Sequence, residues 1–563
     1  MSHLLASTGA ASAASAALLA AAMVVLPPST GTAAPAAPPI VATTEGQLQG
    51  VPSKGVLSFL GIHYGADTGG ANRFLPPVPP PSWGGVKVAD RMGDRCPQPP
   101  VNMPPEMASV LSFSDLPTSE NCLVLNVWTP SIADHAKRPV MVWLHGGGFF
   151  LGSGGDKYYE GSNLSRGQDV VVVTLNHRLN VFGYLQLGPE AGPEYAQSNL
   201  AGMLDIVAAL KWVKANIAQF GGDPDNVTIF GQSGGGSKVS TLLAMPVAQG
   251  LFQKAIIESG AAVRVGTVEA ATATRDKLFT QLGLRPGDVA ALRALPTDTL
   301  MKAGARAGLL AYMPAVDGKT LPTNPFDPVG SPLSAQVPIM VGSTKDEATN
   351  VVLSDPTWQT MTDEDLLKRV GGMVGPQEAA NTIALYRAQA PNDRPMHLYT
   401  SVMTDFMFTT SSITLAERKY AQQAAPVYMY KIDWNSPVLG GKLRSPHAVE
   451  LPFIFDNVDV SAGLVGAGPG QDAMAHLMSA TFAAFARTGN PSIPGAPAWP
   501  AYTPQTRETF IYDVHPSVVA DPNSQLRTYW AARAALPQAG TSPIQSVMDG
   551  KKFDSPASAD HPK

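Results

Sequence analysis

The chain has 563 residues, of which 44% are hydrophobic and 15% charged, and its mean hydropathy is +0.02. This composition supplies a large core and excludes an intrinsically disordered chain or a coiled coil. The 39 Lys and Arg against 44 Asp and Glu give a net charge of −5, so nucleic acid is not an expected partner. The length predicts one elaborated domain with large insertions.

The first 36 residues have the pattern of an export signal. They contain no Lys, Arg, Asp or Glu, and the apolar run Ala16–Leu26 precedes two prolines and then Ala34-Pro35-Ala36. This order predicts a signal peptide over residues 1–36 and a secreted or periplasmic protein. The segment lacks the usual basic residues near its start, and an Ala-rich disordered leader is the alternative. No later apolar run reaches the roughly 18 residues of a membrane span, so no integral membrane segment is expected in the mature chain.

The folded domain is expected to cover residues 37–535. No internal repeat or linker divides it. Residues 536–563 mix Pro, Gly, Ser and Lys without periodicity, as loose tails do.

The two cysteines, Cys96 and Cys122, lie near the start of the mature chain. Export would place them in an oxidising compartment, so a disulfide is predicted, with two buried free thiols as the alternative. A metal site is not expected, because no Cys/His cluster has ligand spacing.

Apolar runs alternate with helical periodicity from about residue 139 onward. Several runs are continuous and β-branched, which is typical of strands buried on both faces. This alternation predicts an α/β fold with a mostly parallel sheet and helices on both faces. The expected strands are Val140–Leu144, Val170–Leu175, Val227–Phe230, Ala255–Glu258, Pro338–Val341 and Val427–Ile432.

A helix is expected between the second and third of these strands. Its apolar residues recur at 3.6-residue spacing from Leu200 to Phe220, behind the capping candidate Asn199, and Gly221-Gly222 ends it. Residues 266–333 and 355–423 are expected to form mainly helices and loops inserted between strands. Such insertions usually build the mouth of a pocket.

Ser233 is the candidate nucleophile. The strand Val227–Phe230 runs into Gly231-Gln232-Ser233-Gly234-Gly235, and an apolar stretch that can start a helix follows. In a strand-turn-helix of this kind the glycines permit a tight turn that holds the serine above the sheet. The G-x-S-x-G pattern alone is weak, and a Gly-rich loop with an idle serine is the alternative.

A second glycine run, His145-Gly146-Gly147-Gly148-Phe149, follows the strand Val140–Leu144. During ester hydrolysis the carbonyl oxygen gains negative charge, which preorganised backbone N–H groups stabilise. The N–H of Gly234, directly after the serine, would supply a further donor. A phosphate-binding loop is the alternative, but the run lacks the G-K-[ST] ending.

A serine needs a base to take its proton, and the base needs a carboxylate to hold its tautomer. In this type of fold the chain order is Ser, acid, His. After Ser233, His476 lies in a helical stretch and His561 in the tail, whereas His447 lies in a loop after the strand Val427–Ile432. His447 is therefore the candidate base, and a surface histidine held by the preceding proline is the alternative.

The candidate acid lies in the loop after the strand Pro338–Val341, which carries Asp346 and Glu347. Catalytic residues gather where parallel strands end at their carboxyl ends. The two carboxylates are adjacent and point differently, so only one can face the histidine. The residue pattern does not choose between them.

These residues resemble those of the type-B carboxylesterases, the carboxylesterase/cholinesterase group of α/β-hydrolases, in the form of an exported bacterial-type esterase. The resemblance covers roughly residues 40–532, and its motifs together are highly specific. They are Ser119-Glu120-Asn121-Cys122-Leu123-Val124-Leu125-Asn126-Val127, Phe220-Gly221-Gly222-Asp223-Pro224 with the serine motif, His145–Phe149, Asn176-His177-Arg178-Leu179, Lys345-Asp346-Glu347 and His447-Ala448-Val449-Glu450.

The resemblance implies a role for several further positions. The acid of the family is the glutamate of its Asp-Glu pair, which corresponds to Glu347. The other implied roles are oxyanion donors at Gly147, Gly148 and Gly234, an early disulfide between Cys96 and Cys122, and, at Ser259, a serine that hydrogen-bonds the catalytic glutamate.

Two departures from the family pattern bear on the substrate. The family usually has Glu before the serine and Ala after it, whereas this chain has Gln232 and Gly234, so a negative charge beside the serine is missing. Cholinesterases also place a choline-binding tryptophan in the loop closed by the first disulfide, where cation–π attraction holds the ammonium. No tryptophan lies between Cys96 and Cys122. A neutral ester is therefore favoured over a choline ester.

The sequence thus predicts a serine carboxylesterase that acts on small neutral esters of short to medium chain length. Ser233 would attack the ester, His447 would move the proton, and Glu347 would orient His447, without a metal or organic cofactor. Phe149 and Phe150 are expected to line an apolar pocket. The alternatives are a lipase or polyester hydrolase on insoluble substrates, and a non-catalytic cholinesterase-like binding protein.

Overall fold

The computed structural model describes residues 38–533, apart from 101–113, 135, 309–310, 354 and 356. The expected signal peptide over residues 1–36 and the expected tail over residues 536–563 lie outside the described residues. Within the described part of the chain, no helix combines the length and the apolar character that crossing a bilayer would require.

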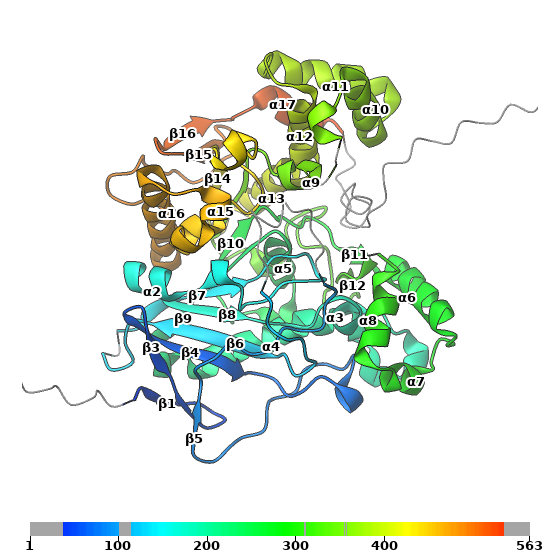
Figure 1. Ribbon diagram of the computed structural model, residues 1–563, viewed down its shortest axis with the longest axis vertical. Helices are drawn as coiled ribbons and strands as arrows, with labels where there is room; N and C mark the ends of the chain where they lie inside the picture. Colours follow the sequence, from blue (N-terminus) through cyan, green and yellow to red (C-terminus); the bar gives the residue numbers. More distant parts are fainter. Residues whose placement is uncertain are drawn as a thin grey trace, which may run out of the picture. The chain divides into compact units, whose positions relative to one another are not determined.

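An 11-stranded sheet runs through the domain in the order β16-β15-β14-β13-β10-β9-β7-β8-β6-β4-β3 (Figure 1). The strands from β8 to β15 in this order pair in parallel, and antiparallel pairs form both edges. The bounds are β3 (Val51–Ser53), β4 (Val56–His63), β6 (Val124–Thr129), β7 (Arg138–Leu144), β8 (Val171–Leu175), β9 (Gly222–Gln232), β10 (Lys254–Glu258), β13 (Ile339–Thr344), β14 (Val427–Ile432), β15 (Glu508–Tyr512) and β16 (Ser517–Ala520).

The six predicted strands are confirmed as β7, β8, β9, β10, β13 and β14. Strand β7 shows why the apolar runs are continuous. Val140, Val142 and Leu144 point into one core cluster, whereas Met141 and Trp143 point into the cluster on the opposite face, and all five are fully buried. Since both faces of a parallel sheet are covered by helices, alternation of polar and apolar residues is lost.

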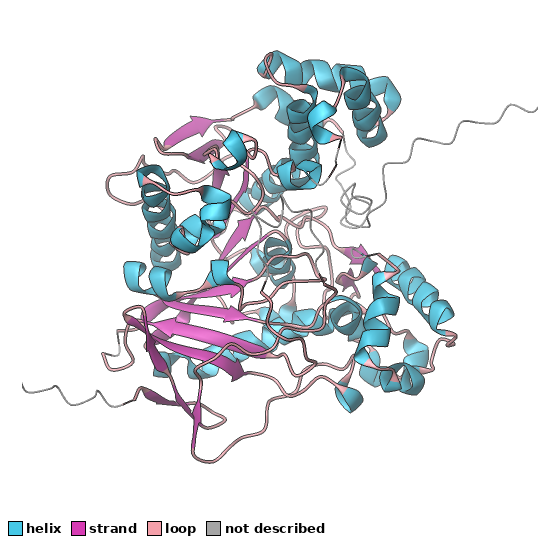
Figure 2. Cartoon of the chain, in the orientation of Figure 1, coloured by secondary structure: helices cyan, strands magenta, loops and turns pink. Residues whose placement is uncertain are grey.

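Helices cover both faces of this sheet (Figure 2). The core on one face includes side chains of α3 (Asn180–Tyr184), α4 (Ala201–Asn216), α5 (Gly234–Leu242) and α13 (Thr410–Tyr420). The core on the other face includes side chains of α2 (Ser162–Gln168), α14 (Leu451–Ile454), α16 (Pro469–Thr488) and α17 (Ser524–Ala531).

The helix expected after residue 199 is confirmed as α4, which continues into a 3-10 turn over Ile217–Phe220 and ends at Gly221. The predicted cap was wrong. Leu200 occupies the N-cap position, and no side chain caps the helix. The Asn199 amide instead donates to the carbonyl oxygen of Tyr184 at 2.8 Å and accepts from the N–H of Ala315 at 2.7 Å. Its side chain is buried, so tertiary hydrogen bonds replace the local one.

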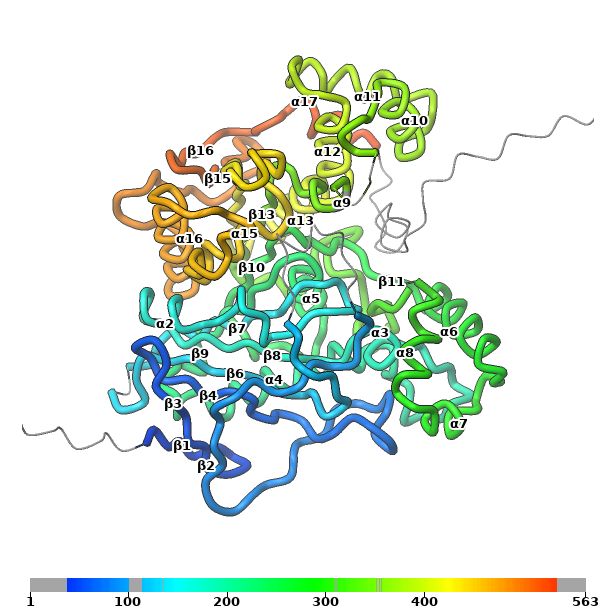
Figure 3. The backbone as a smooth tube through the Cα atoms, viewed as in Figure 1, coloured from blue at the N-terminus to red at the C-terminus, as the bar shows by residue number. Residues whose placement is uncertain are grey.

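The two predicted insertions form separate helical groups, green and yellow-green in Figure 3. The first contains β11 (Gly266–Thr267), α6 (Val268–Leu282), α7 (Val289–Ala294), α8 (Thr297–Ala305) and β12 (Ala315–Val316). The second contains α10 (Asp363–Val374), α11 (Pro376–Gln389), α12 (Pro395–Thr404) and a π-helical turn over Asp405–Thr409 that leads into α13. The remaining elements are α9 (Thr349–Leu353), α15 (Ala462–Val465), and the small sheet of β1 (Ile40–Ala42), β2 (Gln47–Gln49) and β5 (Val86–Val88).

A disulfide joins Cys96 to Cys122, as predicted, and both cysteines are buried. The bond closes a loop of 26 positions next to the start of β6. It therefore ties the strand to the irregular segment that precedes it.

Replacing both cysteines by alanine should lower the free energy of unfolding by about 3 kcal/mol, because the unfolded chain regains the entropy of the open loop. Urea unfolding of the oxidised protein and of the double variant measures this difference. Either single variant breaks the same bond and should lose a similar amount. Equal stability of the wild type and the double variant would contradict the expectation.

Candidate active site

Ser233 lies in the turn between β9 and α5. Its backbone has φ 58° and ψ −122°, a region that residues other than glycine rarely adopt. The N–H of Ser233 donates to the carbonyl oxygen of Glu258 at 2.8 Å, which ties the turn to the end of β10. The predicted strand-turn-helix context of Ser233 is therefore confirmed.

The glycines of this turn allow two backbone segments to touch. A Cβ atom added to Gly235 would lie 2.0 Å from the carbonyl oxygen of Leu144, and one added to Gly231 would lie 2.6 Å from the same oxygen. Real side-chain carbons do not approach a carbonyl oxygen this closely. The turn can therefore lie against the end of β7 only because both positions are glycine.

The glycine run after β7 meets the same turn. Gly147 and Gly148 have φ angles of 80° and 61°, and a Cβ atom added to Gly234 would lie 2.5 Å from the nitrogen of Gly148. The N–H groups of Gly147 and Gly148 have no acceptor among the described residues. Gly234 is the first residue of α5, where N–H groups lack intrahelical acceptors. These glycines are thus candidate donors to an anionic oxygen.

The candidate base and the candidate acid are in direct contact. Nδ1 of His447 lies 2.5 Å from Oε2 of Glu347, and the Glu347 side chain is fully buried. Oε1 of Glu347 accepts a hydrogen bond from the N–H of Thr344 at 2.7 Å, which fixes the carboxylate. This contact resolves the choice that the residue pattern left open.

The neighbouring Asp346 has different partners. Its carboxylate accepts from the N–H of Ser445 at 3.3 Å and lies 3.8 Å from the Arg444 guanidinium. Asp346 also forms an isolated parallel bridge with Pro446, the residue before His447. Asp346 therefore holds the loop that carries the histidine, and Glu347 faces the histidine itself.

Opposing effects act on the pKa of His447. Burial lowers it, but the charge and the hydrogen bond of Glu347, together with the charge of Glu450, outweigh burial and raise the pKa above its usual value. A histidine in this setting accepts a proton more readily than one in water. The arrangement therefore suits a general base whose imidazolium form is stabilised by buried carboxylates.

The expectation for Ser259 needs correction, because its hydroxyl donates to Glu450 at 3.1 Å and not to Glu347. The Oε1 atom of Glu347 instead accepts a hydrogen bond from the backbone N–H of Thr344. Glu450 is fully buried, and burial together with the charge of Glu347 raises its pKa to about 7. Sequence reasoning missed Glu450, although an acidic residue three positions after the candidate base was a usable signal.

Gln232 lies against the candidate base. Its Nε2 is 3.1 Å from Nε2 and 3.3 Å from Nδ1 of His447, so the amide packs against the imidazole ring and does not point along the lone pair of one nitrogen. In the described part of the chain, no hydrogen bond joins the Ser233 hydroxyl to His447. The residue before the serine thus packs against the ring of the candidate base.

Comparison with known proteins shows the family of this chain. Residues 37–530 match the sequence model of the Carboxylesterase family. The chain belongs to the carboxylesterase family. It is 38% identical to the para-nitrobenzyl esterase of Bacillus subtilis, and the aligned region covers 87% of this chain and 97% of that protein. The family makes the protein a serine hydrolase that cleaves carboxylic esters, with an α/β-hydrolase fold.

Solved structures of carboxylesterases share the fold. The Geobacillus stearothermophilus carboxylesterase EST55 superposes with a TM-score of 0.77 at 39% identity, covering 87% of this chain and all of that one (100%). An esterase from Clostridium hathewayi, described as able to hydrolyse aliphatic aromatic polyesters, has a TM-score of 0.75 at 33% identity and covers 88% and 98% of the two chains.

The structure places the two candidate pocket residues of this carboxylesterase differently. Phe149 is 8% exposed and packs edge-on against Tyr184 at 5.1 Å, within the core under the glycine run. The expected pocket role of Phe149 stays a prediction. Phe150 does line a small cavity, together with Val181 and Met301.

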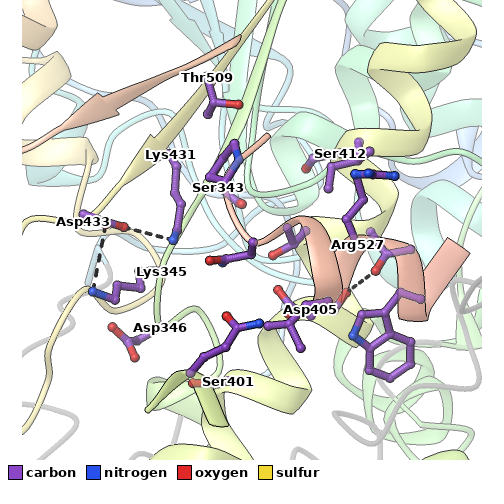
Figure 4. Close-up of a pocket in the computed structure, with 18 of the residues that line it drawn as sticks. Ser343, Lys345, Asp346, Ser401, Asp405, Ser412, Lys431, Asp433, Thr509 and Arg527 are labelled. Carbon is purple, nitrogen blue, oxygen red and sulfur yellow. Dashed lines mark hydrogen bonds and ion pairs between the residues drawn. The ribbon is translucent and has the colours of Figure 1, made fainter. Parts of the chain in front are cut away.

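A larger cavity of about 290 Å³ lies beside the carboxylesterase site without including it (Figure 4). Neither Ser233 nor His447 lines it. The ammonium of Lys431 lies 3.2 Å from Asp433, and that of Lys345 lies 3.9 Å from the same carboxylate. Two ammonium groups thus share one carboxylate, as Figure 4 shows, and we assign no ligand to this cavity.

Two glycine-to-alanine variants of this carboxylesterase distinguish a steric clash of the added Cβ atom from the entropic effect of replacing glycine. Gly235→Ala should lower the free energy of unfolding by about 3 kcal/mol or more, because its Cβ would overlap the Leu144 carbonyl. Gly372→Ala, in α10 with no atom near its Cβ, should raise it by about 0.5–1 kcal/mol. Denaturant unfolding measures both, and equal effects of the two variants would refute the steric argument.

Proposed function

We propose that this carboxylesterase hydrolyses small neutral esters through Ser233, His447 and Glu347, by way of an acyl-enzyme intermediate. The observation that carries the proposal is the 2.5 Å contact between His447 and the buried Glu347, next to the strained serine turn. A serine hydroxyl, an acid and a histidine base, in this chain order, form the machinery of acyl transfer.

In the proposed first step, the oxygen of Ser233 attacks the ester carbonyl and Nε2 of His447 takes the serine proton. The charge on the carbonyl oxygen would be stabilised by the N–H groups of Gly147, Gly148 and Gly234.

The tetrahedral intermediate then collapses, and His447 donates its proton to the departing alcohol. Water repeats the sequence on the acyl-enzyme: His447 takes a proton from water, and Ser233 regains its proton as the acid leaves. Glu347 keeps the imidazole in one tautomer throughout. Every proton in this scheme passes between the substrate, water and the chain's own residues.

The proposed substrates are neutral, with short to medium acyl chains. The neutral side chain of Gln232 beside the serine supports this choice, because a cationic ester gains no attraction there. We also propose that the protein is exported to the periplasm or secreted. The pattern of residues 1–36 and the Cys96–Cys122 disulfide support export, since disulfides persist in oxidising compartments.

An insoluble polyester is a second candidate substrate. The structural similarity to the Clostridium hathewayi esterase favours including it, because that protein's description names polyesters. The bond chemistry is the same, so the two proposals differ in how the substrate reaches the serine.

A panel of chromogenic esters of increasing acyl length, assayed with the wild type and Ser233→Ala, tests the function. We expect short to medium esters to be cleaved and the variant to lose about 1,000-fold or more in rate. A fluorophosphonate should label the wild type and not the variant. Robust cleavage by Ser233→Ala would refute the mechanism, and an unlabelled wild type would favour a non-catalytic binding protein. A rise in turnover only at an interface would favour the lipase or polyester alternative.

The pH profile tests His447. As pH falls through the raised pKa of His447, the base becomes protonated, so kcat/KM should fall with a midpoint above the ordinary value of about 6.5. Glu347→Gln removes the negative charge that raises this pKa, so its midpoint should move to lower pH and its plateau should fall. A wild-type profile that stays flat down to about pH 4 would exclude His447 as the base.

A further inference from the structure

Lys238 is a fully buried lysine in α5, one turn beyond Ser233. Lysines are almost never fully buried unless a carboxylate pairs with them. Among the described residues, no acidic side chain forms a salt bridge with Lys238. Burying a charged amine without a counterion costs free energy, and burial accordingly lowers the pKa of Lys238 well below its usual value.

Both contacts of the Lys238 amine fall on the glycine run. Nζ donates a hydrogen bond to the carbonyl oxygen of His145 at 2.8 Å. The same atom lies 5.6 Å from the centre of the Phe149 ring, within the range of a cation–π contact. Lys238 thus touches the residue that begins the run and the residue that ends it.

The carbonyl of Gly147 accepts two backbone hydrogen bonds from the residues that follow the run, at 3.3 and 3.1 Å. Gly147 and Gly148 have no side chains, and their positive φ angles are open to several alternative conformations. The direction of the first peptide plane of the run depends in addition on what holds its beginning. The hydrogen bond from Lys238 sets the direction of the His145 carbonyl, and with it the peptide plane that leads into the glycines.

The histidines on the other side of the amine do not provide a counterion either. The rings of His145 and His177 stack at 4.8 Å, and burial, with Lys238 next, lowers the pKa of each well below its usual value. Both rings are therefore neutral. The backbone carbonyl of His145 remains the hydrogen-bond acceptor of the lysine.

We propose that Lys238 is a positioning residue that holds the glycine run in the geometry needed to bind the oxyanion. The inference rests on the proposed function, because it assigns Lys238 a task in the same acyl transfer. Lys238 itself contacts neither the ester nor Ser233. Its effect would reach the reaction through the N–H groups of Gly147 and Gly148.

Lys238→Met tests the proposal, because it keeps most of the side-chain volume and removes the donor. Donors displaced by a fraction of an ångström stabilise the transition state less, so kcat should fall about 10- to 100-fold while KM changes less than about threefold. Affinity for a trifluoromethyl ketone, which forms a tetrahedral adduct on the serine, should weaken by a similar factor. A purely structural lysine would lower the melting temperature and leave both readouts unchanged.

Lys419→Met is the matched control. Lys419 is also fully buried and donates to backbone carbonyls, those of Ser334 and Ala335 at 2.7 Å each, but it lies on α13 away from the glycine run. We expect this variant to lose stability and to retain the kcat and ketone affinity of the wild type.

The concentration of active sites is measured by fluorophosphonate labelling, so that kcat is calculated per folded molecule. Folded Lys238→Met with kcat and ketone affinity within about twofold of the wild type would overturn the inference. If that variant does not fold, it is replaced by Lys238→Gln, which retains an N–H donor. The proposal expects kcat and ketone affinity of this variant to change together, because both depend on the same backbone donors. A change in only one of the two would also overturn the inference. A wild type that is neither labelled nor active would refute the proposed function instead.

Discussion

The site depends on direct backbone contact between the turn that carries Ser233 and the end of β7. No side chain separates them, because Gly231 and Gly235 both lie against the carbonyl oxygen of Leu144. This contact brings the first N–H of α5 beside the glycine run and forces the serine into a strained backbone conformation. Strain of this kind persists only where the surrounding packing determines it, and here two parallel strands buried on both faces supply that packing.

Buried carboxylates form the other half of the site. Glu347 contacts His447, Glu450 lies next to them, and the fully buried Glu258 has no hydrogen-bond partner for either carboxylate oxygen among the described residues. Burial, and then the charge of Glu450, raise the pKa of Glu258 well above its usual value. Burial and nearby negative charge therefore oppose the ionisation of Glu258 and Glu450.

Two polar side chains from the serine turn and its helix act on opposite sides of Ser233. Gln232 packs against the ring of His447, and Lys238 donates to the backbone of the glycine run. In the proposed mechanism, the second contact fixes where the backbone donors lie.

The sequence by itself determined the central strands, the glycine turn with Ser233, and the carboxylesterase family, because local patterns and short motifs carry that information. It could not choose between Asp346 and Glu347 by pattern, since adjacent side chains differ only in what they face. It also misjudged Asn199 and the partner of Ser259. Only the tertiary structure decided these, because each depends on contacts between segments far apart in the chain, which no local pattern records.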